Sequence, residues 1–229
     1  MGSELGYSKL LEKILLSWSS GKDSAWALHL LAGRNVVGLI TSFNTQASRV
    51  AMHGVRRELA HAQAERTGLP LWSVELPWPC SNAEYEERMR ALCDRALAAR
   101  VTRIAFGDLF LEDIRAYREK QLQPTGLQPL FPVWKLPTHE LAREMIRAGL
   151  KAKIACVDSR QLPAEFAGRD FDETLLEELP PAVDPCGENG EFHTFVYDAP
   201  GWTSAIDVQR GETVERDGFV YADFLERAA

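Results

Sequence analysis

A seven-residue stretch, WSSGKDS at residues 18–24, lies between an apolar run at residues 14–16 and a helix-like run at residues 25–31. A strand that ends in small hydroxylated residues, turns at a glycine and opens a helix presents several backbone N–H groups in one concavity. The free N–H groups and the positive dipole end of the helix add to them. The pattern therefore predicts a phosphate cradle at the start of a helix.

The side chains of this stretch fit the same prediction. Four of them keep the turn open or offer hydroxyl donors, namely Ser19, Ser20, Gly21 and Ser24. Lys22 supplies a positive charge that a phosphate can share. Asp23 is a carboxylate among anions, which is explained if it holds a divalent metal or if it caps the new helix.

Two common nucleotide loops are excluded by spacing. The Walker loop needs Ser or Thr directly after Gly-Lys and a glycine five residues before that Gly, whereas this chain has Asp23 and Leu16 there. The dinucleotide fingerprint needs three glycines, and Gly21 is the only glycine between Gly6 and Gly33. A plain strand-to-helix turn with serine caps stays open at this point.

A second block, DPCGENGEFHT at residues 184–194, narrows the interpretation. SxGKDS after a strand resembles the signature of the PP-loop ATP pyrophosphatases, which cleave ATP between the α and β phosphates to activate a carboxylate or carbonyl as its adenylate. The second block resembles an element of the diphthine–ammonia ligase family within that group. Residues 103–120 and 126–154 resemble the family's intervening blocks, so the similarity runs from about residue 13 to residue 202.

The resemblance implies a reaction and its participants. It implies binding of ATP with Mg²⁺, transfer of AMP to a carboxylate-bearing acceptor with release of pyrophosphate, and attack by ammonia to form an amide. The acceptor that the family implies is the modified histidine diphthine on elongation factor 2. Residues 19–24 would hold the phosphates, Lys22 and Asp23 would act in catalysis, and Asp23 would help to hold Mg²⁺. Thr41, Ser42 and Phe43 would contact adenosine.

Further candidates follow the later strands. Gly107 and Asp108 end the fourth predicted strand, where a carboxylate can reach the reacting end of ATP; acids at a helix N-terminus are the alternative for Asp108. Glu188 and Glu191 flank a glycine-rich turn and are expected to act in catalysis, facing the acceptor or the ammonia, with a polar surface turn as the alternative. His53 is expected at the mouth of the nucleotide site.

The chain departs from the family pattern at two places. Ser20 stands where the family often has Gly, and Ile114-Arg115 stands where its middle helix often has Tyr-Gln. The second change falls where acceptor recognition is expected. Three alternatives therefore stay open, namely amidation or activation of a small metabolite, a nucleotide sensor without turnover, and modification of transfer RNA.

Composition indicates which kinds of protein and partner are compatible with this chain. A chain of 229 residues with 45% hydrophobic residues can bury a sizeable core. The formal net charge of −7 disfavours nucleic acid as a partner. No apolar run is long enough to span a bilayer and no signal peptide is visible, so we expect a cytoplasmic protein, and a homo-oligomer is compatible with the sequence. The four cysteines form no C-x-x-C pair.

Hydrophobic patterning predicts the fold class. Strands expected at residues 13–17, 36–41, 69–76 and 103–106 alternate with helices, which indicates a Rossmann-like parallel sheet of the HUP type with helices on both faces. Prolines punctuate the chain after residue 125. We therefore predict an ATP-binding domain at residues 1–125 and a smaller α+β, acceptor-binding subdomain at residues 126–229, closed by a hairpin around Asp217-Gly218.

Overall fold

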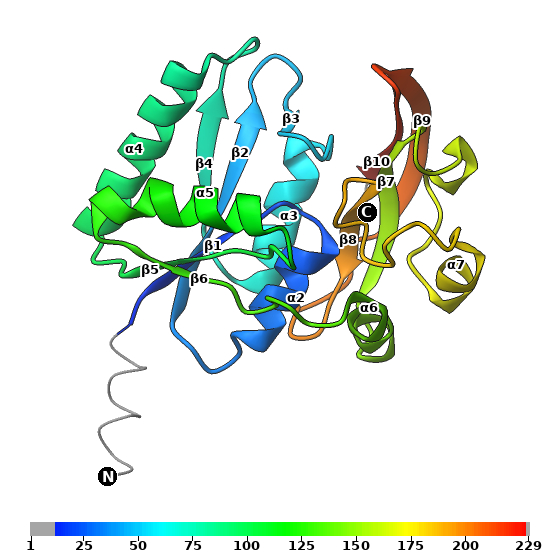
Figure 1. Ribbon diagram of the computed structural model, residues 1–229, viewed down its shortest axis with the longest axis horizontal. Coiled ribbons are helices and arrows are strands. Elements are labelled where there is room, and N and C mark those ends of the chain that lie inside the picture. Colours follow the sequence, from blue (N-terminus) through cyan, green and yellow to red (C-terminus); the bar gives the residue numbers. More distant parts are fainter. Residues whose placement is uncertain (1–11, 228–229) are drawn as a thin grey trace.

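The computed structural model describes residues 12–227, and its first sheet is the predicted α/β sheet (Figure 1). Four strands run parallel to β1 in the order β4-β2-β1-β5-β6, and the short β3 pairs antiparallel with the end of β2. The strands are β1 (Ile14–Ser17), β2 (Val36–Asn44), β3 (Arg49–Val50), β4 (Leu71–Leu76), β5 (Arg103–Ala105) and β6 (Gln128–Leu130). The predicted fold class is confirmed.

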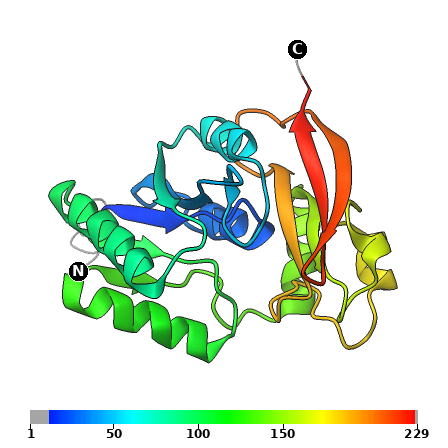
Figure 2. The same ribbon diagram turned by 90° about the horizontal axis from the view of Figure 1, so that it is seen from above.

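Helices cover both faces of this sheet, as predicted (Figure 2). The helices are α2 (Lys22–Leu30) and α3 (Arg57–Thr67) on one face and α4 (Asn82–Ala98) and α5 (Glu112–Leu122) on the other. Leu15, Ile40 and Ile104 point from the sheet toward α4 and α5, whereas Ile14 and Leu16 point toward α2 and α3. This alternation is the two-residue period of a strand buried on both faces.

The C-terminal part of the chain forms a second, antiparallel sheet in the order β8-β7-β10-β9. Its strands are β7 (Lys151–Asp158), β8 (Phe192–Asp198), β9 (Val208–Arg216) and β10 (Phe219–Glu226), accompanied by α6 (Thr138–Arg147) and α7 (Glu173–Glu178) and the short 3₁₀ turns η1 (Gln123–Thr125) and η2 (Ala164–Phe166). The predicted hairpin is confirmed: β9 and β10 pair around Asp217-Gly218, whose φ angles are 55° and 81°.

The two sheets share one hydrophobic core. Buried side chains of α2 and α3, including Trp26 and Leu59, belong to the same cluster as Phe192, Phe195 and Val196 of β8. Strand β6 begins after residue 125 and yet completes the first sheet, so the chain crosses to the second sheet only after it. The division of the chain into folding units stays a prediction.

No helix within residues 12–227 is long and apolar enough to cross a membrane.

Candidate active site

Strand β1 is the switch point of the first sheet, because its successor β2 lies on one side of it and β5 lies on the other. In open α/β sheets, ligands bind beyond the carboxyl ends of the strands at such a point. The first turn of α2 and the loop of residues 106–111 meet there. Gly107 permits the contact, since a Cβ on it would lie 3.0 Å from backbone atoms of Asp23 and Ser24.

The predicted phosphate cradle lies at the start of α2, and its binding of phosphate stays a prediction. Gly21 is the N-cap of α2 with an extended backbone, φ −94° and ψ 171°, and no side chain caps the helix. The hydroxyls of Ser19 and Ser24 lie 3.2 Å apart, and that of Ser24 donates to the carbonyl of Gly21 at 2.9 Å. A Cβ on Gly21 would come within 3.3 Å of the backbone and hydroxyl of Thr194. The helix therefore begins at an open, small-residue turn that suits an anion.

Lys22 is buried at the centre of this arrangement. Its ammonium donates to Asp23 Oδ2 at 2.9 Å and to the carbonyl of Cys186, and it lies 5.4 Å from the centre of the Phe192 ring. Burial is the largest single influence and opposes its charge, but Asp23, Cys186 and Glu188 together outweigh it and hold the pKa of Lys22 above its ordinary value. A buried cation is thus held between the first motif and the second.

One carboxylate oxygen of Asp23 has no hydrogen-bond partner among the described residues. Its Oδ2 accepts from Lys22, whereas its Oδ1 is buried without a hydrogen-bond partner within residues 12–227. A carboxylate oxygen without a partner is a ligand of the kind that Mg²⁺ prefers, so Asp23 would be the residue that holds such an ion. No group of three or more His, Cys, Asp or Glu side chains in the described part of the chain is arranged to hold a metal on its own.

Glu188 connects the second motif to the loop after β5. Its Oε1 accepts hydrogen bonds from the backbone N–H groups of Leu109 at 2.7 Å and Phe110 at 3.4 Å. Burial raises the pKa of Glu188 to about 7, against the opposing hydrogen bond from Leu109. A carboxyl group with a pKa near neutrality can take up or release a proton during a reaction at pH 7.

Glu191 shapes the turn that carries Glu188. Its side chain is buried, and its Oε1 accepts from the backbone N–H of Asp184 at 2.9 Å and from the Asn189 amide at 3.1 Å. Its Oε2 is buried and has no partner among the described residues. Glu191 therefore holds the turn with one oxygen, and its catalytic role stays a prediction.

Asp108 faces α5 rather than the phosphate cradle. Its Oδ2 lies 3.6 Å from Nε of Arg118, whose guanidinium is 5.0 Å from the centre of the Phe106 ring. Burial raises the pKa of Asp108, and Arg118 opposes that rise. The backbone of the β5 loop meets the cradle through Gly107, whereas the carboxylate of Asp108 is paired elsewhere. Its catalytic role stays a prediction.

Two of the three side chains expected to contact adenosine, Thr41 and Phe43, are buried and in contact with other side chains or backbone of the protein. The Thr41 hydroxyl is buried and donates to the carbonyl of Trp18 at 2.8 Å. Phe43 is fully buried, stacks parallel to His61 and has the Arg57 guanidinium 4.1 Å from its ring centre. Ser42 is half-buried between them. Contact of these residues with adenosine stays a prediction.

His53 and His193 form a pair beside the cradle. Their ring centroids are 4.4 Å apart, and Nδ1 of His53 is buried without a partner within residues 12–227. Burial lowers the pKa of both, that of His193 to about 4, and the nearby charge of Lys22 lowers both further. Both imidazoles are therefore neutral at pH 7 and suit hydrogen bonding rather than charge pairing. Contact of His53 with the nucleotide stays a prediction.

Sequence reasoning missed two residues that hold the site together. Thr194 Oγ1 accepts from the backbone N–H of Lys22 at 2.9 Å. Gln63 is fully buried on α3, donates to the carbonyls of Ser20 at 3.0 Å and Val196 at 2.6 Å, and accepts from Trp18 Nε1 at 2.8 Å. A signal for Gln63 existed, because it lies on the apolar side of α3, four residues after Leu59.

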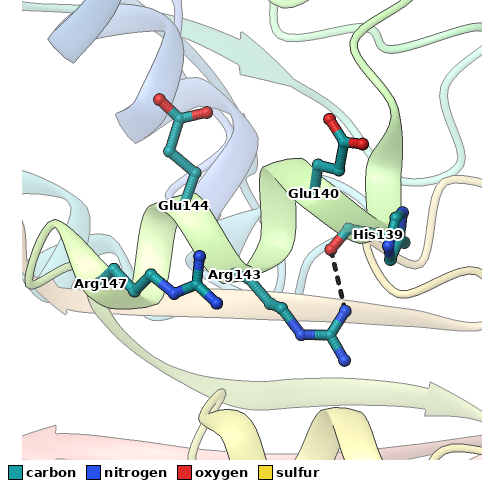
Figure 3. A pocket seen from close by; sticks show the side chains of 5 residues that line it. All are labelled: His139, Glu140, Arg143, Glu144 and Arg147. Atoms are coloured by element: carbon teal, nitrogen blue, oxygen red, sulfur yellow. Dashed lines mark hydrogen bonds between the residues drawn. The ribbon is translucent and has the colours of Figure 1, made fainter.

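The Cys186 thiol and a depression along α6 have no role in the candidate site. Burial raises the pKa of the Cys186 thiol well above its ordinary value, which agrees with a packing role. A depression along one side of α6 is lined by five residues of that helix (Figure 3): His139, Glu140, Arg143, Glu144 and Arg147. Two of its arginines lie 3.5 and 3.9 Å from Glu173, and no predicted site residue lines it.

Ser20 carries backbone strain that glycine would relieve. Its φ is 69°, and its buried hydroxyl has no partner within residues 12–227. Ser20→Gly is therefore expected to raise the free energy of unfolding by about 1 kcal/mol in urea titrations. An unchanged KM for ATP would mean that Ser20 acts through its carbonyl, which accepts from Gln63 and Val196. A clear rise in that KM would instead mean that the hydroxyl binds the nucleotide.

Comparison with known proteins gives a consistent result over both sheets. The sequence profile of the diphthamide synthase N-terminal domain matches residues 12–129, and that of the diphthamide synthase C-terminal domain matches residues 137–225. The diphthine–ammonia ligases of Homo sapiens and Bos taurus are 28% and 30% identical to this chain, in each case over 91% of it and 89% of the relative. That of Schizosaccharomyces pombe is 25% identical over 89% of this chain and 37% of its own length.

Proposed function

The chain belongs to the diphthamide synthase family, and on this premise we propose that it is an ATP-dependent carbon–nitrogen ligase. The resemblance seen in the two sequence motifs is thereby confirmed. The proposed reaction has two steps. A carboxylate oxygen of the acceptor attacks the α-phosphorus of ATP and pyrophosphate leaves; ammonia then attacks the acyl carbon, AMP leaves and an amide forms. The first part of the chain would bind ATP, and the second would supply the residues that face the acceptor.

The first step rests on the cradle of residues 19–24. Backbone N–H groups at the start of α2 would bind the phosphates, and Lys22 would keep its buried charge near them. The orphaned Oδ1 of Asp23 would hold Mg²⁺, which supplies neutralisation of the pyrophosphate charge when bound. These residues would act by positioning and by stabilising charge, which supply most of the rate in phosphoryl chemistry.

The second step rests on Glu188, and this is the observation that carries the proposal. A carboxyl group with a pKa of about 7 is held by the β5 loop within the electrostatic reach of Lys22 and Asp23. It can bind ammonium as a carboxylate and accept a proton when the amine attacks. Glu191 would hold the turn that aims it.

The acceptor is the open part of the proposal. The relatives are named for diphthine, and we propose diphthine on elongation factor 2 as the first acceptor to test. Arg115, at a departure from the family pattern, lies 4.9 and 4.8 Å from the ring centres of Phe131 and Trp134 and pairs with Glu119 at 2.8 Å. Because Arg115 stands where the family often has another residue and where acceptor recognition is expected, a small carboxylate metabolite is the second acceptor class to test.

The function is tested with ATP, Mg²⁺ and ¹⁵N-labelled ammonia, in separate reactions with diphthine-bearing elongation factor 2 and with a set of small carboxylic acids. We expect AMP, pyrophosphate and one labelled amide in equal amounts. Glu188→Gln should retain exchange of labelled pyrophosphate into ATP and lose at least about a hundredfold of the amide. A chain that binds ATP but forms no AMP with any acceptor would be a nucleotide sensor, and the ligase proposal would fail.

The pKa of Glu188 predicts the pH dependence of amide formation. If the carboxylate is the active form, the ratio of the wild-type rate to the Glu188→Gln rate should rise as pH increases through about 7 and then level off. Using the ratio removes the dependence of both rates on free ammonia. The raised pKa of Glu188 also lowers the free energy of unfolding as pH rises from about 4.5 to about 7. The reason is that the folded state binds the proton of Glu188 more tightly than the unfolded state does. A ratio that is flat between pH 5.5 and 8.5 would exclude Glu188 as the proton acceptor.

A further inference from the structure

Strand β9 is an open edge of the second sheet. The sheet order β8-β7-β10-β9 leaves its outer side without a neighbouring strand among residues 12–227. Residues 212–217 are exposed at every position, so solvent reaches both faces of the strand as well as its edge. Figure 1 shows β9 at the margin of the molecule, away from the first sheet. Such an edge is a template for another strand.

The hairpin turn determines which backbone groups point outward. Asp217 and Gly218 both have positive φ, as in a two-residue type I′ turn, and Arg216 pairs with Phe219 across it. A two-residue turn of this kind is closed by a hydrogen-bonded pair, and such pairs alternate along the hairpin. Hydrogen bonding to β10 therefore falls at Arg216 and Val214, and the N–H and C=O groups of Thr213 and Glu215 face outward.

The sequence of the edge is complementary to itself in one register. If two copies pair antiparallel about a two-fold axis at Val214, each Glu212 lies opposite Arg216 of the other copy and Val214 lies opposite itself. Val214 is 43% exposed, although it is apolar. Neither Glu212 nor Arg216 forms an ion pair within the part of the chain that the structure describes.

Neighbouring registers are disfavoured by like charges. An axis at Thr213 places Arg210 opposite Arg216, and an axis at Glu212 places that carboxylate opposite itself. Of these three registers, only the one centred on Val214 forms two pairs of opposite charge and brings no like charges opposite each other. The charge pattern thus favours a second copy of this chain over an unrelated strand.

We propose that two copies of the chain form a two-fold symmetric dimer by antiparallel pairing of β9. The two four-stranded sheets become one continuous sheet, with two Glu212–Arg216 pairs on either side of the Val214 contact. The active sites lie away from this edge, so the dimer does not depend on the proposed reaction.

The test is the oligomeric state of the full chain by sedimentation velocity, over a concentration series at low salt. We expect a concentration-dependent dimer. Glu212→Arg and Arg216→Glu should each raise the dimer dissociation constant by about tenfold or more, because two attractive pairs become repulsive. The double variant Glu212→Arg/Arg216→Glu should restore the dimer, and the exposed control Glu87→Arg should leave it unchanged. Circular dichroism verifies that each variant is folded. A wild-type chain that stays monomeric at the highest concentration, or a double variant that remains as weak as the single ones, would overturn the proposal.

Discussion

Replacing Asp23 by asparagine is expected to reduce acceptor-dependent pyrophosphate release by about a thousandfold. The substitution keeps the size of the side chain but removes the charge that pairs with Lys22 at 2.9 Å, and it replaces one of the two carboxylate oxygens, of which Oδ1 has no partner within residues 12–227, by an amide nitrogen that does not bind Mg²⁺. Loss of the carboxylate therefore weakens the proposed Mg²⁺ ligand and removes the negative charge beside the buried ammonium of Lys22, which keeps its hydrogen bond to the Cys186 carbonyl. Pyrophosphate release at saturating ATP, with a coupled phosphatase assay, measures the effect.

Asp108→Asn is the matched control for that experiment. The same chemical change is made in a loop that adjoins the cradle, but the carboxylate of Asp108 points to Arg118 on α5. We expect a reduction of no more than about tenfold, since an ion pair outside the cradle contributes little to the chemistry. Equal losses in the two variants would show that Asp108 reaches the reacting phosphates. Full activity of Asp23→Asn would remove Asp23 from the proposed metal site.

Replacing Gln63 by leucine is expected to lower the free energy of unfolding by about 2 to 5 kcal/mol. The amide is the buried bridge between the loop after β1 and strand β8, with two donated bonds and one accepted bond. Leucine has a similar size but leaves the Trp18 indole N–H and the Val196 carbonyl without this partner in a region that water does not reach. Such unpaired groups carry the full cost of desolvation.

Urea denaturation followed by tryptophan fluorescence measures this loss, and Gln46→Leu is its control. Gln46 is exposed in the loop after β2, and its side chain makes no hydrogen bond to another described residue. That variant should stay within about 0.5 kcal/mol of the parent. The midpoint for Gln63→Leu should fall strongly, with an unchanged dependence on urea concentration. A loss below about 1 kcal/mol would mean that water replaces the bridge.

Local patterns were sufficient for most of the fold. Short apolar runs, typical of strands buried on both faces, located β1, β2, β4 and β5, and helical spacing located α4 and α6 within a few residues. The two short strands β3 and β6 were not predicted. Strand β3 has only two residues, and β6 contains Pro129 in a proline-punctuated stretch, so neither has a pattern long enough to be recognised.

The candidate site was only partly visible in the sequence. The turn at residues 18–24 and the block at residues 184–194 were chosen for their residue types, and the structure brings them together through Lys22. The direction of Asp108 was not predictable, because it lies in the loop after β5, which ends at Ala105, and the two-residue alternation of a strand does not extend into a loop. The role of Gln63 depends on partners 43 and 133 residues away, which no local pattern encodes.

The sequence by itself determined that a turn of small residues opens α2 and that a glycine-rich acidic turn precedes β8. Those features depend on backbone freedom, small side chains and charge within a few residues of each other. Only the tertiary structure decided that the ammonium of Lys22 lies against the carbonyl of Cys186, 164 residues away, and that Glu188 reaches the β5 loop. The physical reason is that contact between distant segments is decided by how the two sheets pack around one core, and that packing also raises the pKa of Glu188 to about 7.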